Sequence, residues 1–190
     1  MITIKSNDHV LAGFAKQLRA IGQGQTRRAM VRAVNRTTTS AKSRVIRAVA
    51  KQSSIPRPIV VGTVKHRTAR VSGTGSIEGV IWGKGAPLSL KHFRPRQTKI
   101  GTTAIVYGKR EVHAGAFMGP RPGVIAPRLG GHVFEREGKE RTPISLQTGP
   151  SVPEEMVRDL AEREFHNTVE DVLPRRLAHE IGRILNGQGR

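Results

Sequence analysis

The sequence contains no cysteine among its 190 residues. Without thiols the chain forms no disulfide, binds no metal through cysteine and has no thiol nucleophile, which is compatible with a reducing cytosol. Met1–Lys5 lacks the charged-then-apolar pattern of a signal peptide. No apolar run approaches the roughly 18 residues that cross a bilayer. We therefore expect a soluble protein without a membrane partner.

Large apolar side chains are also scarce. Aromatic residues make up 4% of the chain, whereas glycine (21) and proline (11) are frequent. Burial of apolar surface is the main favourable contribution to folding, so this composition stabilises a compact monomer only modestly. A single domain over residues 1–190 that completes its core or its sheet against neighbouring copies fits the composition better.

Acidic residues are outnumbered, with 14 Asp and Glu against 33 Lys and Arg, and the sequence pI is about 11.7. Residues 1–60 hold 12 basic residues and one acidic residue, residues 61–149 hold 15 and 5, and residues 150–190 hold 6 and 8. This distribution predicts a polyanionic or acidic partner, and it lets the basic part of one subunit meet the acidic part of another. The competing interpretation is a solvated basic surface, which self-repulsion disfavours.

The basic N-terminal part, residues 1–60, has the pattern of helices. Residues 8–21 predict a short amphipathic helix that Asp8 caps and that Gly22 and Gly24 end. A longer helix is expected from Thr26 to about Gln52. Its expected inner side carries Met30, Ala33, Val34, Thr37, Ala41, Val45 and Val49, and its opposite side carries Arg28, Arg32, Arg36, Lys42 and Arg47. Pro56 or Pro58 is expected to start a further short helix.

Residues 61–149 predict a β-sheet with long loops. Three strand pairs are expected, at Thr68–Val71 with Ile77–Trp82, Thr102–Tyr107 with Glu111–Ala114, and His132–Arg136 with Thr142–Leu146. Turns at Gly73–Ser76, Gly108–Arg110 and Glu137–Lys139 join these pairs. Ala86–Phe93 is a weaker strand candidate, and Phe117–Leu129 predicts an extended loop. Edge strands of such a sheet invite pairing with another copy.

A long C-terminal helix is expected over residues 150–190. Ser151, Pro153 and Glu154 give a capping-box start, and Pro174 is expected to kink or split the helix. Apolar residues recur every four positions, at Val157, Ala161, Phe165, Val169, Leu173, Leu177, Ile181 and Leu185. The acidic residues of the first turns, Glu155 among them, are interpreted as favouring the helix dipole. The expected fold class is α+β, with N-terminal helices, a small mostly antiparallel sheet and a long kinked C-terminal helix.

Catalysis is poorly supported by the sequence. The seven histidines are scattered, and no metal-ligand spacing, G-x-S-x-G or Walker motif occurs. We expect no enzyme activity, no cofactor and no metal site. The basic residues alternate with Ala, Val and Thr instead of with aromatics, which favours phosphate neutralisation over base recognition. A wall that lines a DNA passage needs this property.

Three segments resemble the phage minor tail protein Z family. Arg28–Thr37 contains Ala33-Val-Asn35-Arg36 and looks like the family's A-x-N-R helix. A second stretch is similar to the family's GAF…V-x-x-R-x-G-K-x-R-x-P-I…GPS-x-P; here it comprises Gly115–Phe117, His132–Arg136, Gly138-Lys139, Arg141–Ile144 and Gly149–Ser151. Leu173-Pro-Arg-Arg-Leu177 is similar to the family's R-L-P-x-x-L. The second stretch is the most specific of the three.

The resemblance implies a tail-completion subunit at the head-proximal end of a phage tail, next to the tail terminator and the head-tail connector. It implies helices around a small, mostly antiparallel sheet and assembly into a ring of identical copies, for example a hexamer. Such a virion protein is made in the host cytoplasm, helps to join head to tail, and surrounds or contacts the genomic DNA.

Two alternatives remain open from the sequence: a nucleic-acid-binding protein without sequence preference and, less favoured because no carboxylate cluster occurs, a nuclease. For Asn35 and Arg36 the competing interpretation is a solvated helix surface, and for Gly138 it is a turn. The candidate interface or DNA-facing residues are Arg28, Arg32, Asn35, Arg36, Arg47, Arg94, Arg96, Lys99, Arg136, Lys139 and Arg141.

Overall fold

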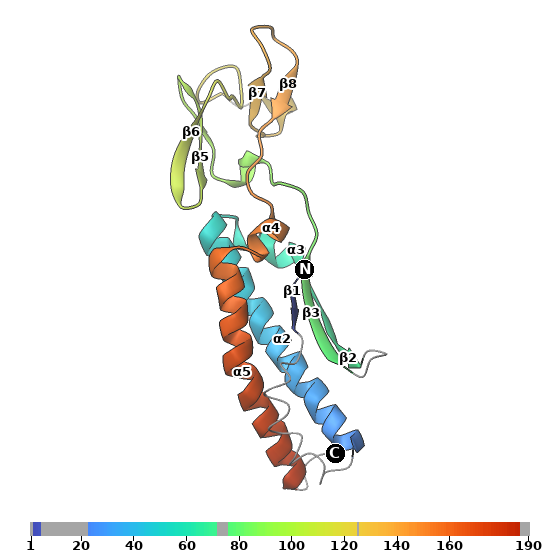
Figure 1. The fold of residues 1–190 in the computed structure, drawn as a ribbon. Helices are drawn as coiled ribbons and strands as arrows, with labels where there is room; N and C mark the ends of the chain where they lie inside the picture. The colour runs from blue at the N-terminus through green and yellow to red at the C-terminus, as the bar shows by residue number, and fades with distance from the viewer. Residues whose placement is uncertain (1, 5–22, 72–75, 125, 187–190) are drawn as a thin grey trace.

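The computed structural model describes residues 2–4, 23–71, 76–124 and 126–186. The helix expected at residues 8–21, and most of the turn expected at Gly73–Ser76, lie outside these residues. The molecule is elongated, with two long helices and one β-sheet side by side at one end and two further small β-sheets at the other (Figure 1). The sequence therefore predicted the α+β class correctly.

Helix α2 (Gln23–Ser53) packs along helix α5 (Asp159–Leu185). The expected inner side is confirmed, because Ala33, Val34, Thr37, Ala41, Val45 and Val49 are all buried. The helix begins at Gln23, so the expectation that Gly24 ends a preceding helix and that Thr26 caps this one was wrong. Backbone N–H groups of a first helical turn have no partner within the helix, and a glycine there costs little.

The expected C-terminal helix is broken in two, which contradicts a single helix from Ser151. Helix α4 (Val152–Met156) begins as predicted, with the Ser151 hydroxyl accepting from the Glu154 N–H at 3.4 Å. Arg158 is extended, and α5 begins at Asp159. The side chain of Gln52 bonds both helix ends at this break: Nε2 donates to the Glu155 carbonyl at 2.8 Å, and Oε1 accepts from the Ala161 N–H at 3.1 Å.

Helix α5 continues through Pro174 and is not split there. Of the residues expected on its inner side, Ala161, Phe165, Leu173, Leu177 and Ile181 are buried and Val169 is half-buried. The expectation was wrong for Val157, which precedes α5 and is 46% exposed, and for Leu185, which is 67% exposed while Ile184 is buried instead. A four-residue spacing drifts by about 40° per step around a helix, so it leaves the contact stripe after several steps.

A three-stranded antiparallel sheet, in the order β1-β3-β2, packs against α2 (Figure 1). It consists of β1 (Ile2–Ile4), β2 (Val64–Val71) and β3 (Ile77–Gly83). The predicted hairpin is confirmed, although β2 begins earlier than Thr68. Helix α3 (Arg57–Thr63) precedes β2 and starts after Pro56, as expected from the prolines.

Two further antiparallel sheets replace the single sheet that the sequence predicted. One contains β4 (Arg96–Gln97), β5 (Gly101–Val106) and β6 (Lys109–Ala114), and the other contains β7 (Phe134–Arg136) and β8 (Ile144–Leu146). The β5–β6 turn is formed by Tyr107 and Gly108, with φ values of 51° and 74°, one residue earlier than expected. Two consecutive residues with positive φ match the twist of a hairpin.

The weaker strand expected at Ala86–Phe93 does not form. Only Ser89 makes a bridge, to Thr148, and Leu90–His92 is a short 3-10 helix. This turn buries both Leu90 and Phe93. In an extended strand these two residues, three positions apart, would point to opposite faces. Both residues belong to a continuous apolar core that reaches from α2 and α5 to β5, so the helical end and the strand end share one core.

Candidate functional site

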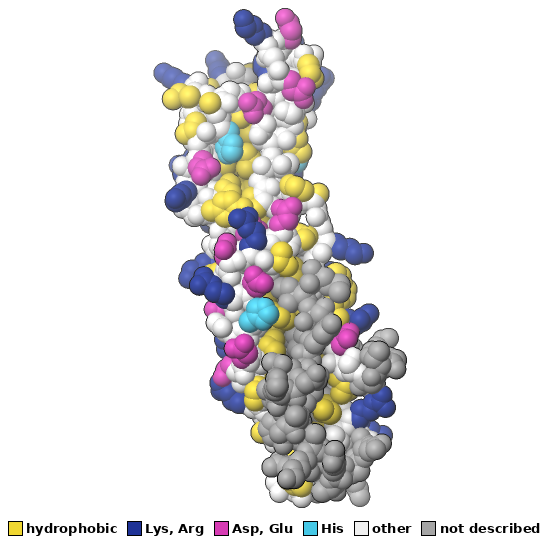
Figure 2. All heavy atoms as spheres, in the orientation of Figure 1, with side chains coloured by type: hydrophobic (Ala, Val, Ile, Leu, Met, Phe, Trp, Pro, Cys, Tyr) yellow, Lys and Arg dark blue, Asp and Glu magenta, His cyan; other side chains and the backbone are white. Residues whose placement is uncertain are grey.

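Helix α2 carries only positive charges, because it has eight Lys and Arg and no acidic residue. Its cations are Arg27, Arg28, Arg32, Arg36, Lys42, Arg44, Arg47 and Lys51. Helical geometry places Arg36, Arg44, Arg47 and Lys51 within about 80° of one another around the axis. The line from Arg28 to Lys51 is about 35 Å long, close to one turn of duplex DNA. Along α5, by contrast, both signs of charge are mixed (Figure 2).

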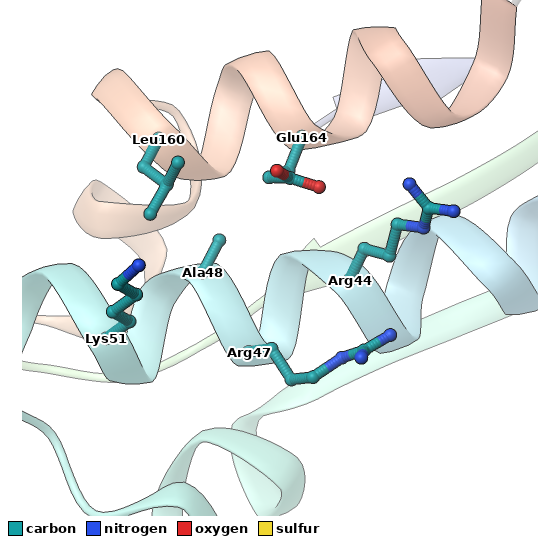
Figure 3. A pocket seen from close by; sticks show the side chains of 6 residues that line it. All are labelled: Arg44, Arg47, Ala48, Lys51, Leu160 and Glu164. Atoms are coloured by element: carbon teal, nitrogen blue, oxygen red, sulfur yellow. The ribbon is translucent and has the colours of Figure 1, made fainter. Parts of the chain in front are cut away.

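A groove of about 330 Å³ lies where this cationic face meets α5. Arg44, Arg47 and Lys51 line it from α2, and Leu160 and Glu164 line it from α5, with the short side chain of Ala48 at its base (Figure 3). Arg44 and Lys51 reach toward α5, whereas Arg47 extends along α2 (Figure 3). No ion pair within the described residues involves Arg44, Arg47 or Lys51. The groove therefore offers several uncommitted positive charges against one carboxylate.

Two of the candidate residues on α2 contact other elements, and a third, Arg47, donates through Nε to the Ser43 carbonyl within the helix at 3.3 Å. Arg32 Nε donates to Glu180 Oε2 at 2.6 Å, which joins α2 to α5, and Glu180 is only 8% exposed. Asn35 Oδ1 accepts from the Ala69 N–H at 2.5 Å. Ala69 lies in the irregularity of β2 between Arg67 and Arg70, where the strand pairing shifts and a backbone N–H needs another partner. Arg28, Arg36 and Arg47 remain exposed.

The other candidates lie beyond the C-terminal end of α2, in and near the two small sheets. Arg94 precedes β4, Arg96 lies in it, and Lys99 follows it. The Arg136 guanidinium lies over the Phe117 ring at 5.3 Å, while Lys139 and Arg141 are exposed between β7 and β8. The structure therefore separates the candidates into an α2 group and a strand-end group. The sequence missed Arg44 and Lys51, although helical spacing from Arg47 would have identified both.

The sequence also missed the internal role of Glu155, which was interpreted as a helix-dipole residue. Its side chain is 2% exposed and accepts hydrogen bonds from Gln52 Nε2 at 2.8 Å, Tyr107 OH at 3.1 Å and Arg158 Nη1 at 3.2 Å. Burial, followed by the hydrogen bond to Glu155, raises the pKa of Tyr107. The Glu155 carboxylate raises the pKa of Arg158. Glu155 thus joins α2, α4 and the β5–β6 turn.

One grouping has the residue types of a nucleophilic site: Ser89, Lys91 and His132. The Ser89 hydroxyl lies 2.8 Å from His132 Nδ1, and Lys91 Nζ lies 3.0 Å from His132 Nε2. A lysine ammonium only donates, so Nε2 accepts and the Nδ1–H donates to Ser89. In this tautomer His132 does not take a proton from the serine, as a general base would. The grouping fastens the segment before β4 to the segment before β7.

A search of residues 2–4, 23–71, 76–124 and 126–186 finds no group of three or more His, Asp or Glu side chains placed to hold a metal ion. Among the helices of this part of the chain, none combines the length and the apolar character needed to cross a membrane.

Residues 11–187 match the family model of the prophage minor tail protein Z. The chain belongs to this family. Membership makes it a structural component of a phage tail and therefore of the virion. A comparison of the chain with curated proteins finds no match, and a comparison with solved structures finds none either.

The stretch that most resembles the minor tail protein Z family forms one structural unit at the strand end. Phe117 and Phe134 exchange backbone hydrogen bonds of 2.8 and 2.9 Å, and β7 pairs with β8 from Phe134↔Leu146 to Arg136↔Ile144. Together with the Asn35 contact, these bonds show that several motif residues hold the fold of this family member.

Proposed function

We propose that the protein is a tail-completion subunit at the head-proximal end of the tail, where it helps to join head to tail with the α2 face against the DNA passage. The concentration of cations on α2, of which Arg44, Arg47 and Lys51 take part in no ion pair of the described residues, is the observation that carries this proposal. Positively charged side chains that lack carboxylate partners attract DNA phosphates whatever the base sequence. Counterion release supplies the free energy of such binding.

The composition of the α2 face favours backbone contact over base recognition. Between its cations stand Ala, Ser, Thr and Val, and within α2 there is no aromatic side chain on which a base would stack. Phosphate contacts position a protein on DNA without reading sequence. This property suits a protein that lets a whole genome pass.

We further propose that copies of the protein form a ring, for example a hexamer, between the tail terminator and the head-tail connector, after synthesis in the host cytoplasm. The strand end supports this part of the proposal. Large apolar side chains are exposed there, at Ile100, Tyr107, Val112, Val124 and Leu146. In the described part of the chain the outer edge of β6 has no strand partner, and such an edge pairs readily with another chain.

Light scattering on the purified protein, at about 0.5 M salt where charges are screened within a few ångströms, tests this proposal. The measurement is repeated with isolated tails. Particles of ring size support tail completion. Sedimentation together with the tails, with the protein bound at one tail end only, supports it as well. A monomer that ignores tails and binds duplex DNA with a steep salt dependence overturns it in favour of a general nucleic-acid-binding protein.

A further inference from the structure

A second cavity lies away from the α2 groove, where the helical end meets the strand end. Its volume is about 400 Å³. It is lined by the end of α2, the start of α3, the turn after the 3-10 helix and β5. The lining residues are Ala50, Ser54, Ile55, Pro56, Arg57, His92, Phe93, Arg94 and Ile105.

The cavity combines an apolar floor with positively charged walls. Ala50, Pro56 and Ile105 are half-buried and supply its accessible apolar surface, over the buried side chains of Ile55 and Phe93. Arg57 and Arg94 are exposed, and His92 is half-buried. Among the described lining residues there is no Asp or Glu. A ligand that fits both parts carries a negative charge beside an apolar group.

The cations of this cavity have no internal partners within the described residues. Elsewhere in the molecule Arg32 is paired with Glu180 and Arg158 with Glu155. No hydrogen bond or ion pair of the described part uses the side chain of Arg57, His92 or Arg94. The charges of Arg57 and Arg94, and the imidazole of His92, are therefore available to an external group.

Arg94 also occupies an unfavourable backbone conformation. Its φ is 50°, in the left-handed region that favours glycine. Ser54, another lining residue, has a φ of 64°. Its hydroxyl accepts a hydrogen bond from the Gly108 N–H at 2.8 Å, so its side chain stabilises the fold. Arg94 has no equivalent contact. Residues in such conformations cluster at binding and active sites, so the backbone of Arg94 directs attention to this cavity.

We propose that this cavity binds an acidic segment of a protein partner, with an apolar side chain against Ala50, Pro56 and Ile105 and a neighbouring carboxylate between Arg57 and Arg94. Arginine binds carboxylates through paired hydrogen bonds, and exclusion of water by the apolar contact strengthens them. A nucleic-acid strand fits less well, because Phe93 is 1% exposed and offers no open face for base stacking. This site goes beyond the proposed function, since it involves neither the α2 face nor DNA.

His92 supplies an internal probe of the cavity. Burial, then the charges of Lys91 and His132, hold its pKa below the ordinary value. A carboxylate bound beside His92 would favour the imidazolium and raise this pKa. Proton titration of the His92 resonance by NMR therefore reports occupancy of this cavity and not of the α2 groove.

The test uses full-length protein and labelled peptides in a fluorescence anisotropy titration. The probe peptide is acetyl-Asp-Glu-Leu-Phe-Asp-amide, and the charge-matched control is acetyl-Asp-Glu-Ser-Ser-Asp-amide. The variants Arg94→Gly and Arg57→Gln remove cavity cations, and Arg94→Gly also relieves the backbone conformation, so the fold is retained. Arg96→Gln is the matched control, because Arg96 is an exposed cation that does not line the cavity.

We expect the apolar acidic peptide to bind at least about tenfold more tightly than the control peptide and to raise the His92 pKa. Each cavity variant should weaken binding about tenfold, the loss of roughly one charge-assisted hydrogen bond, while Arg96→Gln leaves it unchanged. Equal binding of both peptides, displacement by inorganic phosphate or duplex DNA, or no binding overturns the proposal. None of these results bears on ring formation or tail binding, so a failure here is distinct from a failure of the proposed function.

Discussion

The side-chain amide of Gln52 donates hydrogen bonds of 2.8 Å to both the carbonyl and the carboxylate of Glu155. The same side chain accepts from the N–H of Ala161 at 3.1 Å, so one residue of α2 bonds the facing ends of α4 and α5. These contacts hold the two helices together at the point where the C-terminal helix is interrupted.

Replacement of Gln52 by alanine should lower the free energy of unfolding by about 1–3 kcal/mol, because it removes the amide hydrogen bonds to the buried Glu155 carboxylate, to the Glu155 carbonyl and from the Ala161 N–H. Urea denaturation followed by circular dichroism measures this loss. Lys51→Ala, one residue earlier on the exposed side, should change stability by less than about 0.5 kcal/mol. Equal effects of the two variants would contradict the role assigned to Gln52.

Gly79→Ala should destabilise the protein by about 1–3 kcal/mol, because β3 lies too close to α2 for a side chain. A Cβ at Gly79 would stand 2.2 Å from Thr38 Oγ1 and 3.2 Å from Val34 Cγ1. Thermal denaturation measures the effect. Thr38→Ala in the same chain should recover part of the loss, since it removes the nearest atom and makes the two effects non-additive. Gly62→Ala, with no atom within 4 Å, is the control and should not destabilise. A neutral Gly79→Ala would refute this packing.

Asn35→Ala should lower the unfolding free energy by about 1–2 kcal/mol, because it leaves the Ala69 N–H unpaired beside the irregularity in β2. Arg36→Ala, the exposed neighbour, should leave stability unchanged. Chemical denaturation of both variants separates an internal role from an interface role. If Asn35→Ala keeps wild-type stability yet fails to assemble with tails, its contribution lies at an interface.

Neutralising the α2 groove should reduce the salt dependence of DNA binding. The variant combines Arg44→Gln, Arg47→Gln and Lys51→Gln. Each lost phosphate contact lowers the slope of log K against log salt by about 0.9, so the slope should fall by about 2–3. Anisotropy titrations of a duplex at several salt concentrations measure it.

The control for this experiment removes the same charge from exposed cations outside α2, at Lys84, Arg163 and Arg176. A control that loses as much slope as the α2 variant would show that binding follows net charge alone. That outcome would contradict a specific role of the α2 face in DNA binding.

Stability should decrease as the pH falls below 6.5. Burial, and then Lys42, whose Nζ lies 3.4 Å from His66 Nδ1, lower the pKa of His66 from its ordinary value of 6.5. Because the unfolded chain binds the proton more readily, the contribution is fully present above pH 6.5 and is lost as the pH falls through the folded-state pKa. Urea midpoints between about pH 5 and 8 measure this. His66→Gln should flatten the profile, and an unchanged profile would exclude the contribution.

The parts of the fold that the sequence predicted depend on local periodicity. The inner face of α2, with Val45 and Val49, and the hairpins β2–β3 and β5–β6 follow from apolar spacing and from Gly and Pro. The Ser151 cap likewise needs only residues within one turn.

The sequence by itself determined the family, the helix–strand–helix order and the concentration of cations on α2. The tertiary structure alone decided which of those cations are free. Arg32 meets Glu180 across 148 positions of the chain, Gln52 meets Glu155 across 103, and Asn35 meets Ala69 across 34. Such pairs form because burial leaves a polar group with no water to bond, and the group bonds whatever the folded chain brings near. No spacing rule reaches that far, so the break before α5 and the cavity beside Arg94 became visible only in the folded chain.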